Sequence, residues 1–165
     1  MDYFLLLPNE KLSNPLNFSA NEKKFQSLEP FIIETKKVRN VTLVDLIVKK
    51  ILFNTYFFLS NELKKVFEMY NKDINWVQLF VTNGELHSVY WKLDMDETKN
   101  VITNKFLKSK DMLIRPDLLN DKCIHKIHYE KQTFILVNLF VAESIIRRLP
   151  VGLLLQKVKT IEGED

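Results

Sequence analysis

Two stretches of the chain share one plan: residues 55–80 read TYFFLSNELKKVFEMYNKDINWVQLF and residues 133–158 read TFILVNLFVAESIIRRLPVGLLLQKV. Each begins with an apolar run typical of a strand, continues with an amphipathic run typical of a helix, and ends with a second apolar run. They align without a gap at an offset of 78 residues, from 55 to 133, but only Thr55/Thr133 and Gln78/Gln156 are identical. The alignment predicts two strand–helix–strand modules, about 54–81 and 133–158; chance recurrence of a common plan is the alternative.

Local signals define both modules. Ser60 and Asn138 stand at equivalent positions, and either side chain can accept a hydrogen bond from a free amide of the following helical turn. In the first module Leu63, Val66 and Phe67 fall on one apolar helical face. Gly152, in the loop of the second module, can adopt a backbone conformation that other residues resist.

The rest of the chain predicts further elements. Asn83-Gly84 between apolar runs indicates a hairpin with a type I′ turn. Thr42 to Asp45 resembles a capping box, and the apolar spacing after it predicts a helix that ends near Lys50. Four further segments are predicted strands: Tyr3–Leu7, Phe31–Ile33, Leu86–Leu93 and Cys123–Tyr129. A short helix is predicted at Asn21–Leu28.

Length and composition favour one globular domain. The chain has 165 residues, of which 46% are hydrophobic and 27% charged, a balance typical of a folded protein. We therefore expect a single α+β domain over residues 1–165, with an antiparallel or mixed sheet covered by helices on one face.

Charge and cysteine content bear on partners and location. The net charge is +3, and basic and acidic residues are mixed in both halves, so we expect no nucleic-acid partner. Cys123 is the single cysteine, which excludes an intramolecular disulfide and fits a reducing compartment. No apolar stretch approaches the ~20 residues of a membrane-spanning helix, and no secretory signal is recognisable. We expect a cytoplasmic protein without a membrane partner.

The sequence predicts no catalytic, cofactor or metal site. His125 and His128 are three residues apart in a predicted strand and would point to opposite faces, which disfavours a zinc site with Cys123. His87 and Ser88 are adjacent in a strand and diverge, so they do not form a nucleophile and its base. Three glycines in the whole chain are too few for a phosphate-binding loop.

Carboxylates do not change this expectation. Asp94, Asp96 and Glu97 lie in a polar connection, where solvation explains them better than acid–base catalysis does. We therefore predict that the protein is not an enzyme.

Several segments together resemble a known bacterial family. They are FLSNEL at 58–63, VYWKLD at 89–94, LVN at 136–138, AESIIRR at 142–148 and GL at 152–153. In this order, over residues 40–158, the chain resembles a bacterial domain-of-unknown-function family associated with immunity proteins of polymorphic toxin systems. It departs from the family pattern at Asn71–Asp73, where a glycine is expected, and residues 1–40 match no part of it. The resemblance implies a protein that binds and neutralises a cognate toxin.

Four residues are candidates for contact with that toxin. Tyr90 and Lys92 share the less apolar face of a predicted strand; if this face is uncovered, Tyr90 would suit an anchor, and otherwise it would pair across strands. Arg147 and Arg148 lie in the last turn of the second helix, where arginine compensates the helix dipole or contacts a partner. A small-ligand or regulatory protein-binding module is the alternative function, which an apolar pocket rimmed by polar groups would favour.

Overall fold

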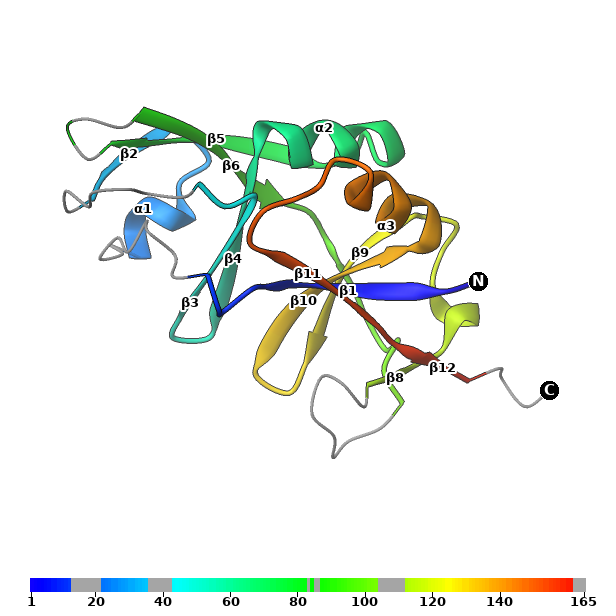
Figure 1. Cartoon of the computed structure of the whole chain (residues 1–165). Helices are drawn as coiled ribbons and strands as arrows, with labels where there is room; N and C mark the ends of the chain where they lie inside the picture. The colour runs from blue at the N-terminus through cyan, green and yellow to red at the C-terminus, as the bar shows by residue number, and fades with distance from the viewer. Residues whose placement is uncertain (13–21, 36–42, 83, 85–86, 104–111, 162–165) are drawn as a thin grey trace.

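The computed structural model describes residues 1–12, 22–35, 43–82, 84, 87–103 and 112–161 (Figure 1). The fold is mixed α/β and rich in sheet, with 48% of residues in strands and 19% in helices, so the sheets supply most of the core. Within the described ranges the chain forms two five-stranded sheets, where the sequence predicted one, and a small two-stranded sheet.

The first sheet has the strand order β2-β5-β6-β4-β3. Its strands are β2 (Phe31–Glu34), β3 (Leu46–Ile51), β4 (Asn54–Ser60), β5 (Asn75–Thr82) and β6 (His87–Asp94). β5 and β6 pair antiparallel over their whole length, which confirms the predicted hairpin. Asn83 lies outside the described residues; Gly84 has a φ of +85°.

The second sheet has the order β11-β1-β10-β9-β7. Its strands are β1 (Tyr3–Pro8), β7 (Glu97–Thr98), β9 (Ile124–Tyr129), β10 (Gln132–Asn138) and β11 (Leu153–Lys157). β1 lies between β10 and β11 and is antiparallel to both. The two-stranded sheet joins β8 (Leu113–Ile114) to β12 (Lys159–Thr160) in parallel.

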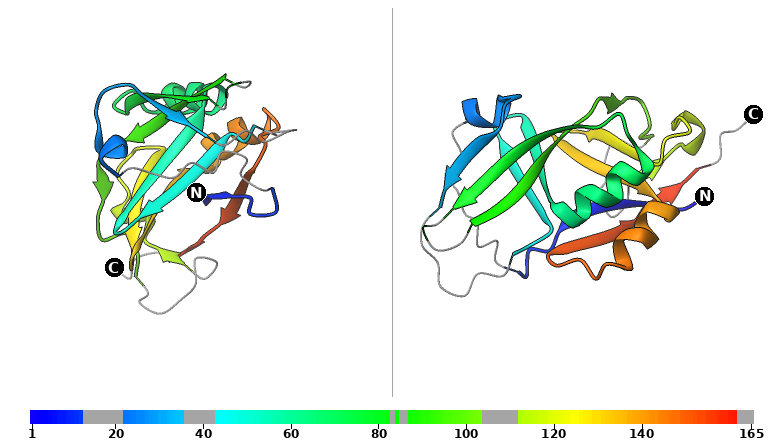
Figure 2. Two further views of the ribbon diagram at one scale, coloured as in Figure 1. Left: turned by 90° about the vertical axis from the view of Figure 1, so that its left-hand side faces the viewer. Right: turned by 90° about the horizontal axis from the view of Figure 1, so that it is seen from above.

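The described helices are α1 (Glu22–Gln26), α2 (Asn61–Tyr70) and α3 (Leu139–Ile146), and a separate 3-10 turn covers Pro116–Leu118. The predicted caps are confirmed: Ser60 Oγ accepts from the Leu63 amide, and Asn138 Oδ1 accepts from the Val141 amide. α2 and α3 lie next to each other (Figures 1 and 2). The Tyr70 hydroxyl on α2 is 2.7 Å from Ser144 Oγ on α3.

Buried apolar residues form three clusters that cover both faces of each large sheet. The central cluster fills the space between the sheets and beneath α2 and α3, with Leu59, Phe67, Val137 and Ile145 among its members. A second cluster, around Phe25 of α1, covers the outer face of the first sheet. The third covers the outer face of the second sheet and includes Met112 and Ile114.

One predicted element is wrong. The segment read as a helix ending near Lys50 contains strand β3, which pairs with β4 from Leu46↔Leu59 to Ile51↔Asn54. Its proposed cap, Thr42, lies outside the described residues. The apolar spacing fitted a helix, but the β-branched side chains of this segment favour a strand when a partner strand is available. The other predicted strands and the short helix at 21–28 correspond to β1, β2, β6, β9 and α1 and are confirmed.

Candidate functional site

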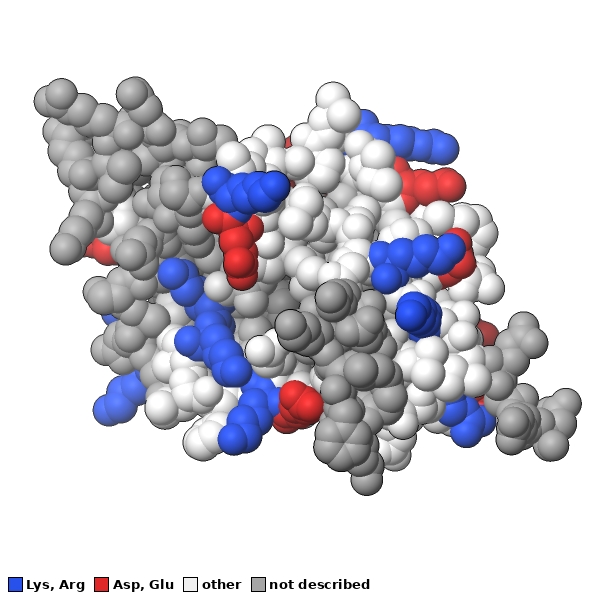
Figure 3. Space-filling model, turned by 60° about the horizontal axis from the view of Figure 1, so that its bottom comes forward, with Lys and Arg blue, Asp and Glu red and all other residues white. Residues whose placement is uncertain are grey.

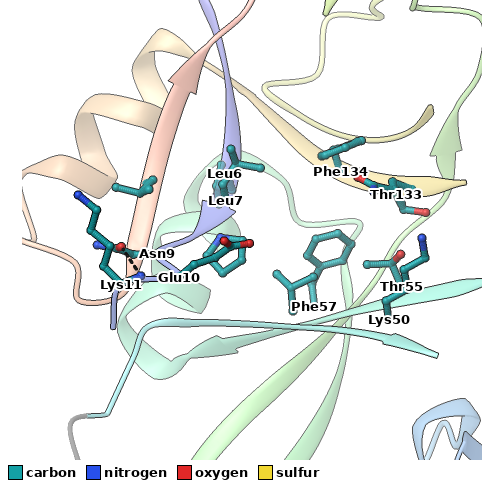
Figure 4. Close-up of a pocket in the computed structure, with 14 residues that line it drawn as sticks. Leu6, Leu7, Asn9, Glu10, Lys11, Lys50, Thr55, Phe57, Thr133 and Phe134 are labelled. Carbon is teal, nitrogen blue, oxygen red and sulfur yellow. Dashed lines mark hydrogen bonds between the residues drawn. The ribbon is translucent and has the colours of Figure 1, made fainter. Parts of the chain in front are cut away.

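A groove of about 620 Å³ opens between the two sheets (Figure 4). Its walls carry apolar side chains from five strands, β1, β3, β4, β10 and β11. Three of these side chains, Leu6, Phe57 and Phe134, are at least nine-tenths buried. Val48 and the half-exposed Leu154 complete the apolar surface. Polar groups lie on either side of it: Lys50, Thr55, Gln132 and Thr133 belong to the two hairpins, whereas Asn9, Glu10 and Lys11 follow β1.

Thr55 and Thr133, an identical pair in the aligned stretches, both line this groove (Figure 4). His128 Nε2 lies 2.8 Å from the Glu130 carbonyl oxygen, which can only accept, so Nε2 carries the proton. In the neutral ring Nδ1 is then an acceptor, and the Thr133 hydroxyl, 3.2 Å away, donates to it. The Thr133 proton is therefore already engaged.

Lys50 and Thr55 lie opposite each other across the β3–β4 hairpin. In the described part of the chain, the Lys50 ammonium has no ion-pair partner and the Thr55 hydroxyl has no hydrogen bond. Lys50 is exposed and Thr55 half-buried. Among the described lining residues, the groove thus offers an ammonium outside any ion pair and a hydroxyl outside any hydrogen bond, beside an apolar surface.

The second notable surface is the outward side of α3 and the turn after it, which we call the α3 face. It comprises Phe140, Glu143, Ile146, Arg147 and Leu149, all exposed, while Val141, Ala142 and Ile145 on the opposite side of the helix are buried. Phe140, Ile146 and Leu149 are exposed by 54%, 56% and 83%. Large apolar side chains gathered on one surface commonly mark an interaction site.

A small hollow adjoins the α3 face. It has a volume of about 260 Å³ and lies between α2 and the loop that leads to β11, with Glu62, Arg148, Leu149 and Val151 in its lining. Arg148 Nη2 also reaches Met69 Sδ of α2, at 4.0 Å. The arginine therefore connects the two helices at this edge.

Arg147 and Arg148 lie just after α3 and not in its last turn as predicted: α3 ends at Ile146, Arg147 is its C-cap and Arg148 follows. Arg148 Nη1 donates to the Ser144 carbonyl at 2.8 Å, which compensates the carbonyl end of α3. Arg147 Nη2 is 3.9 Å from Glu143 Oε2, and its side chain is 81% exposed. Dipole compensation thus accounts for Arg148, and Arg147 is free to contact another molecule.

Tyr90 and Lys92 do not lie on an exposed surface, which corrects their assignment as anchors. Their exposed fractions are 2% and 5%. The Tyr90 hydroxyl donates to the Val44 carbonyl at 2.8 Å, and Lys92 Nζ donates to the carbonyl oxygens of Phe25 and Ser27 at 2.9 and 2.5 Å. Burial raises the pKa of Tyr90 and lowers that of Lys92. Both side chains hold covering segments onto the first sheet, so neither can contact a partner.

The histidines in β9 have structural roles. His125 is buried; its Nε2 donates to the Lys122 carbonyl at 2.8 Å and its Nδ1 accepts from the Thr98 hydroxyl at 3.1 Å. Burial lowers the pKa of His125. His128 is exposed, as expected for the opposite face of a strand. Among the described residues, no group of three His, Cys, Asp or Glu side chains could hold a metal ion.

Ser88 is not hydrogen-bonded to a base in the part of the chain that the structure describes. Its Oγ is buried and lacks a hydrogen-bond partner within the described ranges, and His87 on the same strand is exposed. None of the described helices is long and apolar enough to cross a bilayer.

No protein-family model matches the chain, and no curated protein matches its sequence. The candidate sites therefore rest on geometry. Sequence reasoning missed the groove because its residues come from distant parts of the chain; the identity of Thr55 and Thr133 was the one signal for it. It also missed Phe140, Ile146 and Leu149, because exposed apolar residues in an apolar helix look like core residues.

Proposed function

We propose that this chain is a non-enzymatic immunity protein that acts in the cytoplasm by binding a cognate toxin and occluding it. The α3 face is the observation that carries the proposal, together with the family resemblance of residues 40–158. It combines an aromatic ring, two aliphatic side chains and an exposed arginine, and aromatic residues and arginine are enriched at the energetic centres of protein interfaces.

The way this surface is supported favours binding without rearrangement. Val141 and Ile145, on the inward side of α3, belong to the central cluster, and Asn138 caps the first turn. A helix fixed in this way presents its outward side chains in one arrangement, which reduces the entropy lost on association.

The surface charge supports a protein partner rather than a nucleic acid. Figure 3 shows a run of adjoining lysine and arginine side chains at the lower left of this face, and basic and acidic side chains mixed over the rest of it. Nucleic-acid-binding domains usually have a pI above about 9, whereas this chain has 24 basic and 21 acidic residues and a pI of about 8.8. The net charge of +3 also does not favour an inhibitor that imitates nucleic acid.

Co-expression with the product of the adjoining reading frame tests the proposal. If that product is a toxin, we expect cells to survive only when both proteins are made, and the two proteins to co-purify. Equal killing with and without this protein, together with no co-purification, would show that it is not the immunity protein of that toxin.

Substitutions on the α3 face locate the contact. Phe140→Ser and Arg147→Glu should each weaken toxin binding about thirtyfold or more, as expected for hot-spot residues. Leu28→Ser and Lys72→Glu are matched controls, because Leu28 is 74% exposed near α1 and Lys72 is exposed after α2. If the controls weaken binding as much as the α3-face variants, the α3 face is not the contact surface.

We further infer that the modules at about 54–81 and 133–158 are equivalent units of the α+β fold. The β3–β4 hairpin covers 46–60 and the β9–β10 hairpin covers 124–138, again 78 residues apart. Leu52 and Glu130, the first turn residues of these hairpins, have φ values of 52° and 55°.

The backbone bonds that precede the helices also correspond. The Ser60 amide donates to the Asp45 carbonyl at 2.9 Å, and the Asn138 amide donates to the Cys123 carbonyl at 3.0 Å. The equivalence predicts a loss of about 1 kcal/mol for the cap bond at each position. Ser60→Ala should cost more than Asn138→Ala in total, because the Ser60 hydroxyl also donates to Asp45 Oδ1 at 2.5 Å. If only one of the two cap variants lost stability, the proposed equivalence of the two modules would be wrong.

A small-ligand-binding module is the second candidate function, and the groove of about 620 Å³ between the sheets favours it. Its volume falls in the usual range of ligand pockets, roughly 300–1,000 Å³.

A further inference from the structure

The geometry points to a binding site, in the groove between the two sheets, for a linear monocarboxylate with an apolar chain (Figure 4). This inference develops the small-ligand candidate and does not depend on toxin binding. It follows from three features of the groove: its apolar walls, the donors at one end, and the charges around it.

The apolar walls would contact the chain of the ligand. Leu6, Phe57 and Phe134 are buried and supply a continuous surface that is already formed. Val48 and Leu154 extend this surface toward solvent. Because the walls are aliphatic and aromatic, they favour a hydrocarbon chain over a sugar or another densely polar molecule.

Donors from the β3–β4 hairpin would hold the carboxylate. Lys50 offers an ammonium and Thr55 a hydroxyl, and neither is engaged by another described residue. A carboxylate accepts from both kinds of donor, and bonds between charged partners are the stronger ones. Thr133 lies nearby, but its proton is directed to His128. Thr55 and Lys50 are therefore the specific contacts.

Three charged side chains line the groove, and their arrangement selects a single negative charge on the ligand. Glu10 and Lys11 are neighbours in sequence on the β1 side, whereas Lys50 lies on the hairpin side (Figure 4). Counted together, the formal charges of Glu10, Lys11 and Lys50 leave the lining with a net charge of +1, and Figure 4 places Lys50 beside Thr55 and away from Glu10. A ligand with a second carboxylate at the far end of its chain would meet Glu10, which disfavours dicarboxylates.

Calorimetric titration of the full chain with octanoate, nonanoate and decanoate, each below its micelle concentration, tests the site. We expect one site per chain and an affinity that rises about fourfold for each added methylene. Decyltrimethylammonium, which has a comparable chain and the opposite charge, should bind at least tenfold more weakly. Absence of saturable binding, or equal binding of the cation, would overturn the inference.

Variants tie the binding to the named groups. Lys50→Gln should weaken decanoate binding about tenfold, because it removes the positive charge that strengthens the bond to the carboxylate. Thr55→Val should weaken it about fivefold, because it removes a hydroxyl donor. Lys72→Gln is the control, since it removes one exposed lysine that does not line the groove. If Lys50→Gln binds decanoate as tightly as the unchanged protein does, the site is elsewhere and the inference fails. Thermal melting of each variant confirms that it is folded.

The same variants separate this inference from the immunity proposal. Lys50→Gln should keep full protection against the toxin, and Phe140→Ser should keep full decanoate binding. Either proposal can therefore fail while the other stands.

Discussion

Gly152→Ala should destabilise the protein by about 2–4 kcal/mol. Gly152 has a φ of +73°, and a Cβ added there would lie 2.4 Å from Val44 Cγ1 and 2.6 Å from Val44 Cβ. The left-handed conformation costs an L-residue about 1 kcal/mol net. Overpacking a tight contact adds about 1–3 kcal/mol.

Gly84→Ala separates these two contributions. Gly84 also has a positive φ, +85°, but an added Cβ would meet no atom within 4 Å. This variant should therefore lose only the backbone contribution, about 1 kcal/mol. Urea denaturation of the three proteins, monitored by circular dichroism, gives both differences in the free energy of unfolding.

Equal losses for the two glycine variants would refute the reasoning, because they would show that Val44 does not limit the space at Gly152.

A second test is Val44→Ala in the Gly152→Ala background. Val44→Ala removes Cγ1, which would clash with the added Cβ, but leaves Val44 Cβ in place. We therefore expect the double variant to lose less free energy of unfolding than the sum of the two single variants. The neighbouring bonds explain why the loop cannot simply move away. Val151 N donates to Asp45 Oδ2 at 2.7 Å, and Asp45 N donates to the Val151 carbonyl at 2.8 Å.

Three further substitutions test the buried polar contacts. Tyr90→Phe should cost about 1–3 kcal/mol in urea denaturation, because it leaves the buried Val44 carbonyl without its donor. Lys92→Met should loosen α1, seen as faster amide hydrogen exchange there, because the carbonyls of Phe25 and Ser27 lose their shared ammonium. For His125, burial lowers the folded-state pKa below 6.5, so the unfolded chain takes up the proton first as pH falls. As the pH is lowered from 6.5, the free energy of unfolding should decrease by at most about 1.4 kcal/mol per pH unit because of this histidine. The His125→Gln variant should lack this contribution to the pH dependence.

The sequence predicted those parts of the fold that local signals define. The caps at Ser60 and Asn138, the β5–β6 hairpin and the left-handed glycine at 152 all depend on a few neighbouring residues. Strand β3 was missed because its apolar spacing also fits a helix. Its pairing with β4 and burial against the second sheet decided between the two.

The candidate sites were harder to predict, because exposure is set by distant segments. Tyr90 and Lys92 would be exposed on an uncovered sheet, but α1 and the residues after it come from more than 60 positions earlier and cover that face. Arg147, at the C-cap of α3, is exposed, because a helix end is usually solvated. The groove combines residues of β1, both hairpins and β11, and no linear pattern brings these together.

The two candidate sites are connected by the same strands but are well separated. β4 and β10 line the groove near their first residues, at Thr55 and Thr133, and end at the caps of α2 and α3, Ser60 and Asn138. Five residues of extended strand separate the groove from α3, about 16 Å. A ligand shifts a protein between two conformations only if it binds one of them more tightly. Because the groove is already formed, a ligand that enters it should leave the conformation of the α3 face unchanged. Decanoate should therefore stabilise the protein against unfolding in proportion to its binding, yet leave toxin affinity unchanged. A change in toxin affinity with decanoate would instead show that the central cluster has two packing arrangements.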